Sequence, residues 1–83
     1  MIARPLIAGK DAWTAAGIRH SLWYAWIADG LMVRPIAIGA RLARYPAHEV
    51  QAILDARISG ATDAELRALV ARLHAERLAL KAA

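Results

Sequence analysis

Polar and basic side chains open a short segment that has the periodicity of a helix. Arg19, His20 and Ser21 come first, and their side chains can hydrogen-bond to phosphates or to the edges of bases. Leu22 and Ala25 follow on the same face and could contact thymine methyl groups. Because a short helix presented by a tight turn fits the major groove of duplex DNA, this segment predicts a DNA contact.

A second group of basic side chains accompanies an alternating apolar pattern over residues 35–45, which predicts a small hairpin with its tip near residues 39–41. Arg41 would lie at that tip, where a basic side chain can enter a narrow minor groove. Arg44 would lie lower on the hairpin and meet the phosphate backbone. Arg34 precedes the hairpin and is expected near the phosphates as well.

The residues of the chain do not predict catalysis. His20, His48 and His74 are far apart, with no carboxylate at a metal-ligand spacing, and Ser21 has no glycine-flanked elbow around it. Glu49 stands at an expected helix start, where a carboxylate favours the positive end of the helix dipole. We therefore expect no enzyme activity, no metal site and no cofactor.

Glycines define the elements that must position the DNA-contacting side chains. Gly17 supplies the left-handed conformation that ends a first short helix, and Ile18 fills the turn. A second helix is predicted over residues 19–29, with Trp23 and Trp26 on its core face and Gly30 as its stop. The segment before the first helix, residues 5–8, could add an edge strand to the hairpin.

Charge is unevenly distributed along the chain. Residues 1–45 carry six basic and two acidic groups, a net charge of +4, whereas residues 46–83 carry five of each sign and are neutral. The abundance of arginine over lysine could reflect a GC-rich genome, but a genomic bias would not explain the asymmetry. The excess positive charge therefore favours a nucleic-acid partner for the first half.

Residues 17–30, 35–39, 45 and 49–53 resemble the AlpA-type phage regulators and related small excisionases. The resemblance covers roughly residues 6–58, and its most specific markers are Gly17, Tyr24, Gly30 and Tyr45. It implies a winged helix-turn-helix akin to the DNA-binding domain of MerR proteins. The side chains that it assigns to DNA contact are Arg19, His20, Ser21 and Leu22, with Tyr24 at a phosphate or in the core.

Two positions depart from the pattern of that family. Arg19 stands where the family usually has a Ser or Thr cap, which shifts the expected start of the second helix by a residue. Met32-Val33 replaces an aromatic-proline pair, which alters the turn between helix and wing. The expected fold is therefore mainly α with a small β-hairpin wing, in the winged helix-turn-helix class, followed by a C-terminal helix.

The second half of the chain predicts two further helices. Pro46 suits the first turn of the third helix, which ends before Ser59-Gly60. Thr62 and Glu65 form a capping box that starts a fourth helix running to about Ala79. This helix carries an apolar stripe, formed by Leu66, Leu69, Val70, Leu73, Leu78 and Leu80, that could pack within the chain or mediate oligomerisation. The residues proposed for oligomerisation are Leu66, Leu69, Val70, Leu73 and Leu80. We expect residues 1–59 to form the DNA-binding domain and residues 60–83 to form the packing or oligomerisation helix.

Length and composition limit the remaining classes of protein. Eighty-three residues suit one modest core, and the longest uncharged run, His20 to Ala28, is too short to span a bilayer. The charges near the start predict no signal peptide, and the absence of cysteine suits a cytoplasmic location at the bacterial nucleoid.

The sequence therefore predicts a protein of a phage or bacterial mobile element that binds double-stranded DNA sequence-specifically. Two roles remain open, transcriptional regulation and recombination directionality, in which the protein would bend attachment-site DNA for an integrase of the tyrosine or serine type. Because one winged helix reads few base pairs, cooperative binding as a homo-oligomer is expected. The alternative is a protein-interaction module that uses the C-terminal amphipathic helix.

Overall fold

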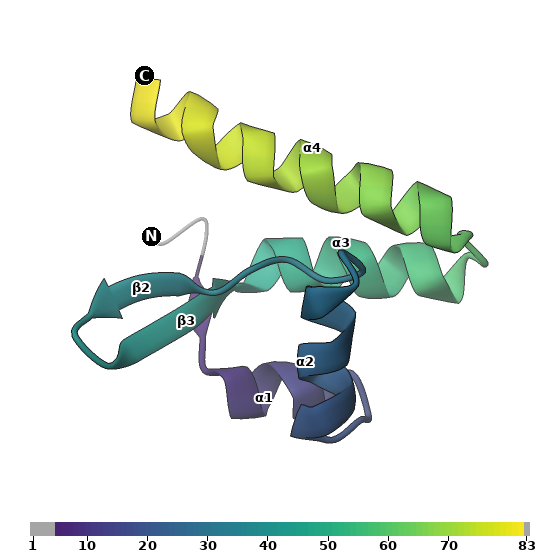
Figure 1. Ribbon diagram of the computed structural model, residues 1–83, viewed down its shortest axis with the longest axis horizontal. Helices are drawn as coiled ribbons and strands as arrows, with labels where there is room; N and C mark the ends of the chain where they lie inside the picture. The colour runs from purple at the N-terminus through teal and green to yellow at the C-terminus, as the bar shows by residue number, and fades with distance from the viewer. Residues whose placement is uncertain (1–4, 83) are drawn as a thin grey trace.

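Four helices and a three-stranded antiparallel sheet make up residues 5–82, which the computed structural model describes (Figure 1). Arg4, one of the six basic residues of the first half, lies outside the described residues. The predicted mainly helical composition with a small hairpin is confirmed. The elements in chain order are β1 (Leu6–Ile7), α1 (Gly9–Ala15), α2 (His20–Ala28), β2 (Ile36–Gly39), β3 (Leu42–Pro46), α3 (Ala47–Ile58) and α4 (Asp63–Ala82).

Glycines end α1 and α2, as the sequence predicted. Gly17 and Gly30 both have a φ of 75°, in the left-handed region that L side chains rarely adopt. At each site the glycine N–H and the next N–H bond back to carbonyls of the last helical turn; for example, Ile18 N–H donates to Trp13 O at 3.0 Å. This closure turns the chain tightly between α1 and α2, so the two helices lie against each other at one end of the molecule (Figure 1).

The sheet has the strand order β1-β3-β2, so the expected entry strand does add to the hairpin. The β2–β3 turn lies at Ala40 and Arg41, within the predicted tip. Pro46 was expected in the first turn of α3, but it is the last residue of β3 and the N-cap of α3. It is still the register partner of Leu6 in the β1–β3 pair. The outer part of the hairpin projects from the core, and its apolar side chains Ile38 and Leu42 are consequently 47 % and 44 % exposed.

One hydrophobic core joins all the helices to the base of the sheet. Its members are Ala12, Trp23, Leu31, Met32, Val33, Tyr45, Val50, Ile53, Leu66, Val70 and Leu73. Helix α3 runs through the middle, with α4 packed on one side and α1 and α2 on the other (Figure 1). The C-terminal helix is therefore part of the same core as the predicted DNA-binding region.

The start of α4 has the predicted capping box. Thr62 N–H donates to Glu65 Oε1 at 3.0 Å, and Glu65 N–H donates to Thr62 Oγ1 at 3.2 Å. Hydrogen bonding to Thr62 lowers the pKa of the Glu65 carboxyl, because the charged form accepts the bond. Although α4 is the longest helix among residues 5–82, none of the helices described there is long and apolar enough to cross a membrane.

Candidate nucleic-acid interface

Helix α2 is anchored to the core along one face and exposed along the others. Trp23 is fully buried and packs edge to face against Tyr45 of β3, with ring centroids 5.2 Å apart. Trp26 is half-buried, with the Arg57 guanidinium of α3 lying 3.9 Å over its ring. These contacts fix the rotation of α2 about its axis. The predicted contact residues are left exposed, namely Arg19, His20, Ser21, Leu22 and Tyr24.

An aromatic cluster supports the exposed side of α2 that faces α1. Trp13 of α1 lies with its ring centroid 6.0 Å from that of His20 and 6.0 Å from that of Tyr24. Tyr24 itself is 53 % exposed, so of its two expected places, phosphate contact or core, the core is excluded. The Trp13 indole therefore holds His20 and Tyr24 at the surface, where their polar groups can reach a ligand.

The N-terminus of α2 keeps its polar backbone groups available. Arg19 stands at the N-cap position with extended backbone, and among the described residues no side chain makes a cap hydrogen bond there. The first-turn N–H groups of a helix have no partner within the helix, and they form its positive end. Such an end favours anions, phosphates in particular. Because Arg19 stands at the N-cap in place of a Ser or Thr, the guanidinium group belongs to the residue next to the free N–H donors of the first turn of α2.

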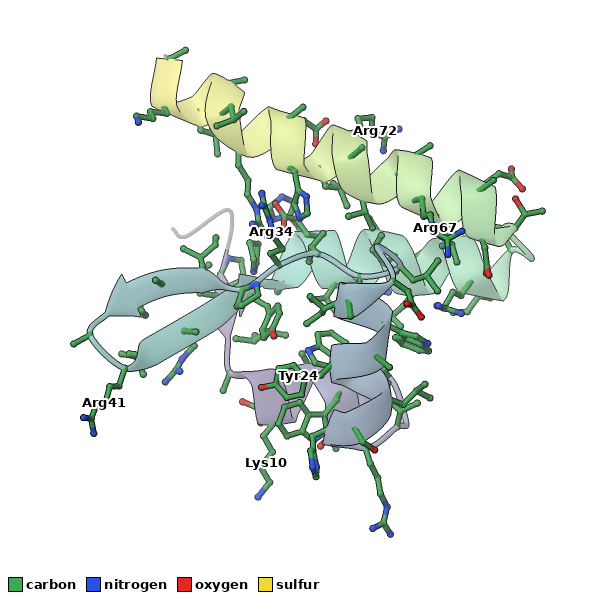
Figure 2. All side chains as sticks on the ribbon, viewed as in Figure 1. Lys10, Tyr24, Arg34, Arg41, Arg67 and Arg72 are labelled. Carbon is green, nitrogen blue, oxygen red and sulfur yellow. The ribbon has the colours of Figure 1, made fainter. Side chains whose placement is uncertain are left out.

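The two arginines of the β2–β3 hairpin lie at different distances from its tip. Arg41 lies in the exposed turn and projects outward (Figure 2). Arg44 lies on β3 opposite Ile36, is half-buried, and donates from Nη1 to the carbonyl of Ala43 at 2.8 Å. Of the two predicted hairpin contacts, Arg41 is the more accessible.

Lys10 is a basic residue that the sequence analysis did not select. It lies on the exposed side of α1, and its side chain projects toward the same side of the molecule as Arg41 (the lower side of Figure 2). Tyr24 lies just above Lys10 in this view, and Arg41 lies at the far left. The sequence held no local signal for Lys10 beyond its charge, because its proximity to α2 follows from how the two helices pack. The candidate interface is thus the exposed side of α2 with Lys10 and Arg41.

Arg34, which was expected near the phosphates, lies apart from Lys10 and Arg41. The loop before it is drawn into the core by Leu31, Met32 and Val33, all of which are buried. Arg34 consequently emerges on the α4 side of the hairpin, away from Lys10 and Arg41 (Figure 2). Its backbone N–H donates to His74 Nε2 at 3.1 Å, and its carbonyl accepts from Arg77 Nη2 at 2.8 Å.

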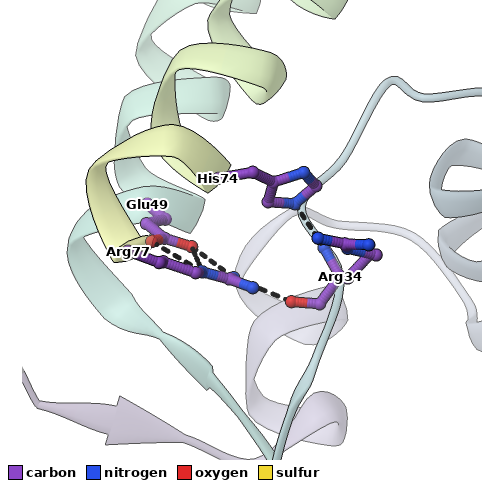
Figure 3. A network of polar contacts seen from close by, with 4 residues as sticks. All are labelled: Arg34, Glu49, His74 and Arg77. Carbon is purple, nitrogen blue, oxygen red and sulfur yellow. Dashed lines mark hydrogen bonds and ion pairs between the residues drawn. The ribbon is translucent and has the colours of Figure 1, made fainter. Parts of the chain in front are cut away.

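His74 and Arg77 belong to a polar network between α4, α3 and this loop (Figure 3). Burial lowers the pKa of His74, and the nearby Arg34 and Arg77 guanidinium groups lower it further. An unprotonated Nε2 is what allows His74 to accept the bond from Arg34. Arg77 also donates from Nε to Glu49 Oε2 at 3.0 Å, and the Glu49 side chain is almost wholly buried. Glu49 was expected to act on the helix dipole, and its ion pair with Arg77 was not predicted from the sequence.

The apolar stripe of α4 is mostly used within the chain. Leu66, Val70 and Leu73 are buried against the core, and Leu69 is half-buried. Of the five residues proposed for oligomerisation, these three are therefore corrected to intramolecular packing, because α3 already covers them. Leu80 is 54 % exposed, since it lies beyond the part of α4 that α3 covers.

Comparisons of this chain with known protein families, with curated proteins and with solved structures found no match. Within residues 5–82, no group of three His, Asp or Glu side chains gathers in a way that could hold a metal ion.

Proposed function

We propose that this protein binds double-stranded DNA sequence-specifically through a winged helix-turn-helix. Helix α2 would enter the major groove, and the β2–β3 hairpin would act as the wing. One observation carries the proposal: the exposed side of α2, whose N-terminus has no side-chain cap, is accompanied by the basic side chains of Lys10 and Arg41, which project to the same side of the molecule. Groove readers combine these parts, since basic groups contact phosphates while helix side chains contact bases.

The chemistry of each side chain suggests its role on DNA. His20 and Ser21 are suited to hydrogen bonds with base edges, and Leu22 is suited to a thymine methyl group. Arg19, together with the free N–H groups at the start of α2, is suited to a phosphate. Arg41 would follow the backbone or enter the minor groove beside the major-groove site.

We further propose that the DNA target belongs to a phage or bacterial mobile element. The resemblance to AlpA-type regulators and small excisionases supports this, and it leaves promoter regulation and recombination directionality as the two roles. In the second role an integrase of the tyrosine or serine type would be the protein partner. Both roles use one binding mode, so the same interface serves either.

One observation favours a second candidate function, a protein-interaction module built on α4. A hollow lies under the last turns of this helix. Its apolar lining residues are Leu6, Ile36, Pro46, Ala79 and Leu80, and its polar ones are His48, Glu49, Glu76 and Arg77. Leu78 and Leu80, both in these last turns, are largely exposed. Contact between copies of the protein on adjacent DNA sites would also use this end of α4, where Leu80 is the exposed member of the proposed oligomerisation set.

Selection from a random duplex library tests the proposed function. Rounds of binding and amplification, followed by sequencing, should yield a short preferred site. His20→Ala and Ser21→Ala should each relax preference at one or two base pairs, at about 1–3 kcal/mol per lost base contact. An enriched pool without any shared sequence would contradict sequence-specific binding and favour the interaction module.

A further inference from the structure

The connection between α2 and β2 sets where the hairpin lies relative to α2, because the two elements have no other covalent link. Its first half is held by burial of Leu31, Met32 and Val33. Its second half, Arg34 and Pro35, is exposed and is not held by apolar packing. This second half is held by polar contacts from α4 instead.

Side chains of helix α4 form hydrogen bonds with both ends of this connection. Arg67 Nε donates to the carbonyl of Asp29, at the end of α2, at 2.9 Å. His74 Nε2 accepts from the N–H of Arg34, and Arg77 Nη2 donates to the carbonyl of Arg34 (Figure 3). Three side chains from one helix therefore fix the start and the end of the connection.

Arg77 also contacts the start of α3, the helix that directly follows the other strand of the hairpin. Its guanidinium binds the carboxylate of Glu49, which is 2 % exposed and stands in the first turn of α3, just after β3 ends. Arg34 stands just before β2 begins. A single guanidinium thus joins the two ends of the hairpin base, since it bonds Arg34 on one strand's side and Glu49 on the other's.

A guanidinium suits this bridge because its donors lie in one plane at fixed angles, so it can bond a carboxylate and a carbonyl together. A lysine ammonium keeps the charge for Glu49 but lacks the planar fork. Loss of the positive charge would leave a buried carboxylate unpaired, which is strongly destabilising. Lysine is therefore the informative replacement at position 77.

We propose that Arg77 and His74 are positioning residues, through which α4 sets the place of the hairpin relative to α2 and so the geometry of the DNA-binding surface. This inference rests on the proposed function for its consequence on DNA, but the positioning itself can be measured without DNA. The alternative is that the two side chains contribute only to the stability of the core.

Distance measurement in the free protein tests the positioning directly. The sequence contains no cysteine, so Ala40→Cys on the hairpin turn and Ala25→Cys on α2 provide two unique sites for spin labels. Double electron-electron resonance should give a narrow distance distribution in the otherwise unchanged chain and a broader or shifted one in Arg77→Lys. Arg72→Gln is the matched control, because Arg72 projects from the outer side of α4 (Figure 2). An unchanged distribution in Arg77→Lys would overturn the proposal.

His74 offers a second route should Arg77→Lys fail to fold. His74→Gln keeps a side-chain acceptor for Arg34 N–H, whereas His74→Phe removes it. The label distribution should broaden in the phenylalanine variant and recover in the glutamine variant. Equal distributions in both variants would show that the contact does not position the hairpin.

A double-mutant cycle on a selected duplex measures the consequence for DNA. Arg41→Ala should weaken binding about tenfold in the unchanged protein. In the Arg77→Lys background that loss should shrink to about twofold, because a displaced hairpin no longer places Arg41 on DNA, while the loss caused by His20→Ala should stay the same. Full additivity of Arg41→Ala and Arg77→Lys would contradict the positioning role. If no duplex bound the unchanged protein, the proposed function would fail, and the distance measurement would still decide the positioning.

Discussion

Trp23 of α2 and Tyr45 of β3 pack edge to face, with ring planes at 83° and centroids 5.2 Å apart. Both side chains are buried, so this contact joins the helix proposed to enter the groove to one of the two strands of the hairpin. Trp23→Ala should lower the free energy of unfolding by about 3–5 kcal/mol, because it leaves a large cavity. Urea denaturation measures this. A loss below about 1 kcal/mol would show that the pair does not anchor α2.

Gly17 should be sensitive to substitution through its backbone alone. A Cβ at this position would meet nothing within 4 Å, yet its φ of 75° disfavours L side chains. Gly17→Ala should therefore cost about 1–2 kcal/mol, and Gly17→Asn should cost less, because asparagine tolerates this region. Thermal unfolding of both variants checks the order. Alanine as well tolerated as glycine would argue against the left-handed turn between α1 and α2.

The stability of the protein should fall as the pH drops below the ordinary histidine pKa of 6.5, because burial and the neighbouring Arg34 and Arg77 lower the pKa of His74 in the folded state. Below pH 6.5 the unfolded chain binds a proton that the folded chain does not, so unfolding is favoured. Above this pH His74 is neutral in both the folded and the unfolded chain, and its contribution to the free energy of unfolding is fully present. Glu49 is the charged group of the network that opposes this shift.

His74→Gln isolates this effect from other titrations. Urea midpoints at pH 7.5, 6.5 and 5.5 should decline more steeply in the unchanged protein than in the glutamine variant, which cannot titrate at this position. Parallel declines in the two proteins would mean that His74 gains its proton equally in both states.

Two leucines of α4 should behave differently, because only one of them is covered. Leu73 is 3 % exposed, so Leu73→Glu should unfold the chain. Leu80 is mostly exposed, and Leu80→Glu should leave the melting temperature nearly unchanged while abolishing cooperative binding to duplexes with several sites. Circular dichroism and gel-shift titration on one-site and multi-site duplexes test both statements. Intact cooperativity in Leu80→Glu would place contacts between copies on another surface.

Local signals in the sequence predicted the boundaries of the helices well. Gly17, Gly30 and the Thr62–Glu65 box act within a turn of their own positions, so their effects can be read from neighbouring residues. Relationships between distant residues could not be read in this way. The burial of Leu31 to Val33 moved Arg34 to the α4 side, and the Glu49–Arg77 pair depends on how α4 crosses α3. Lys10 was missed for the same reason.

The salt dependence of DNA binding tests the central proposal most directly. Fluorescence anisotropy on a selected duplex between about 50 and 200 mM salt should give a log-log slope of about −4 to −5, as expected for four to six phosphate contacts. Lys10→Gln and Arg41→Gln should each reduce the slope by about one, whereas Arg72→Gln should leave it unchanged. An affinity that does not change with salt, or an equal loss in Arg72→Gln, would contradict a DNA-binding surface formed by α2, Lys10 and Arg41.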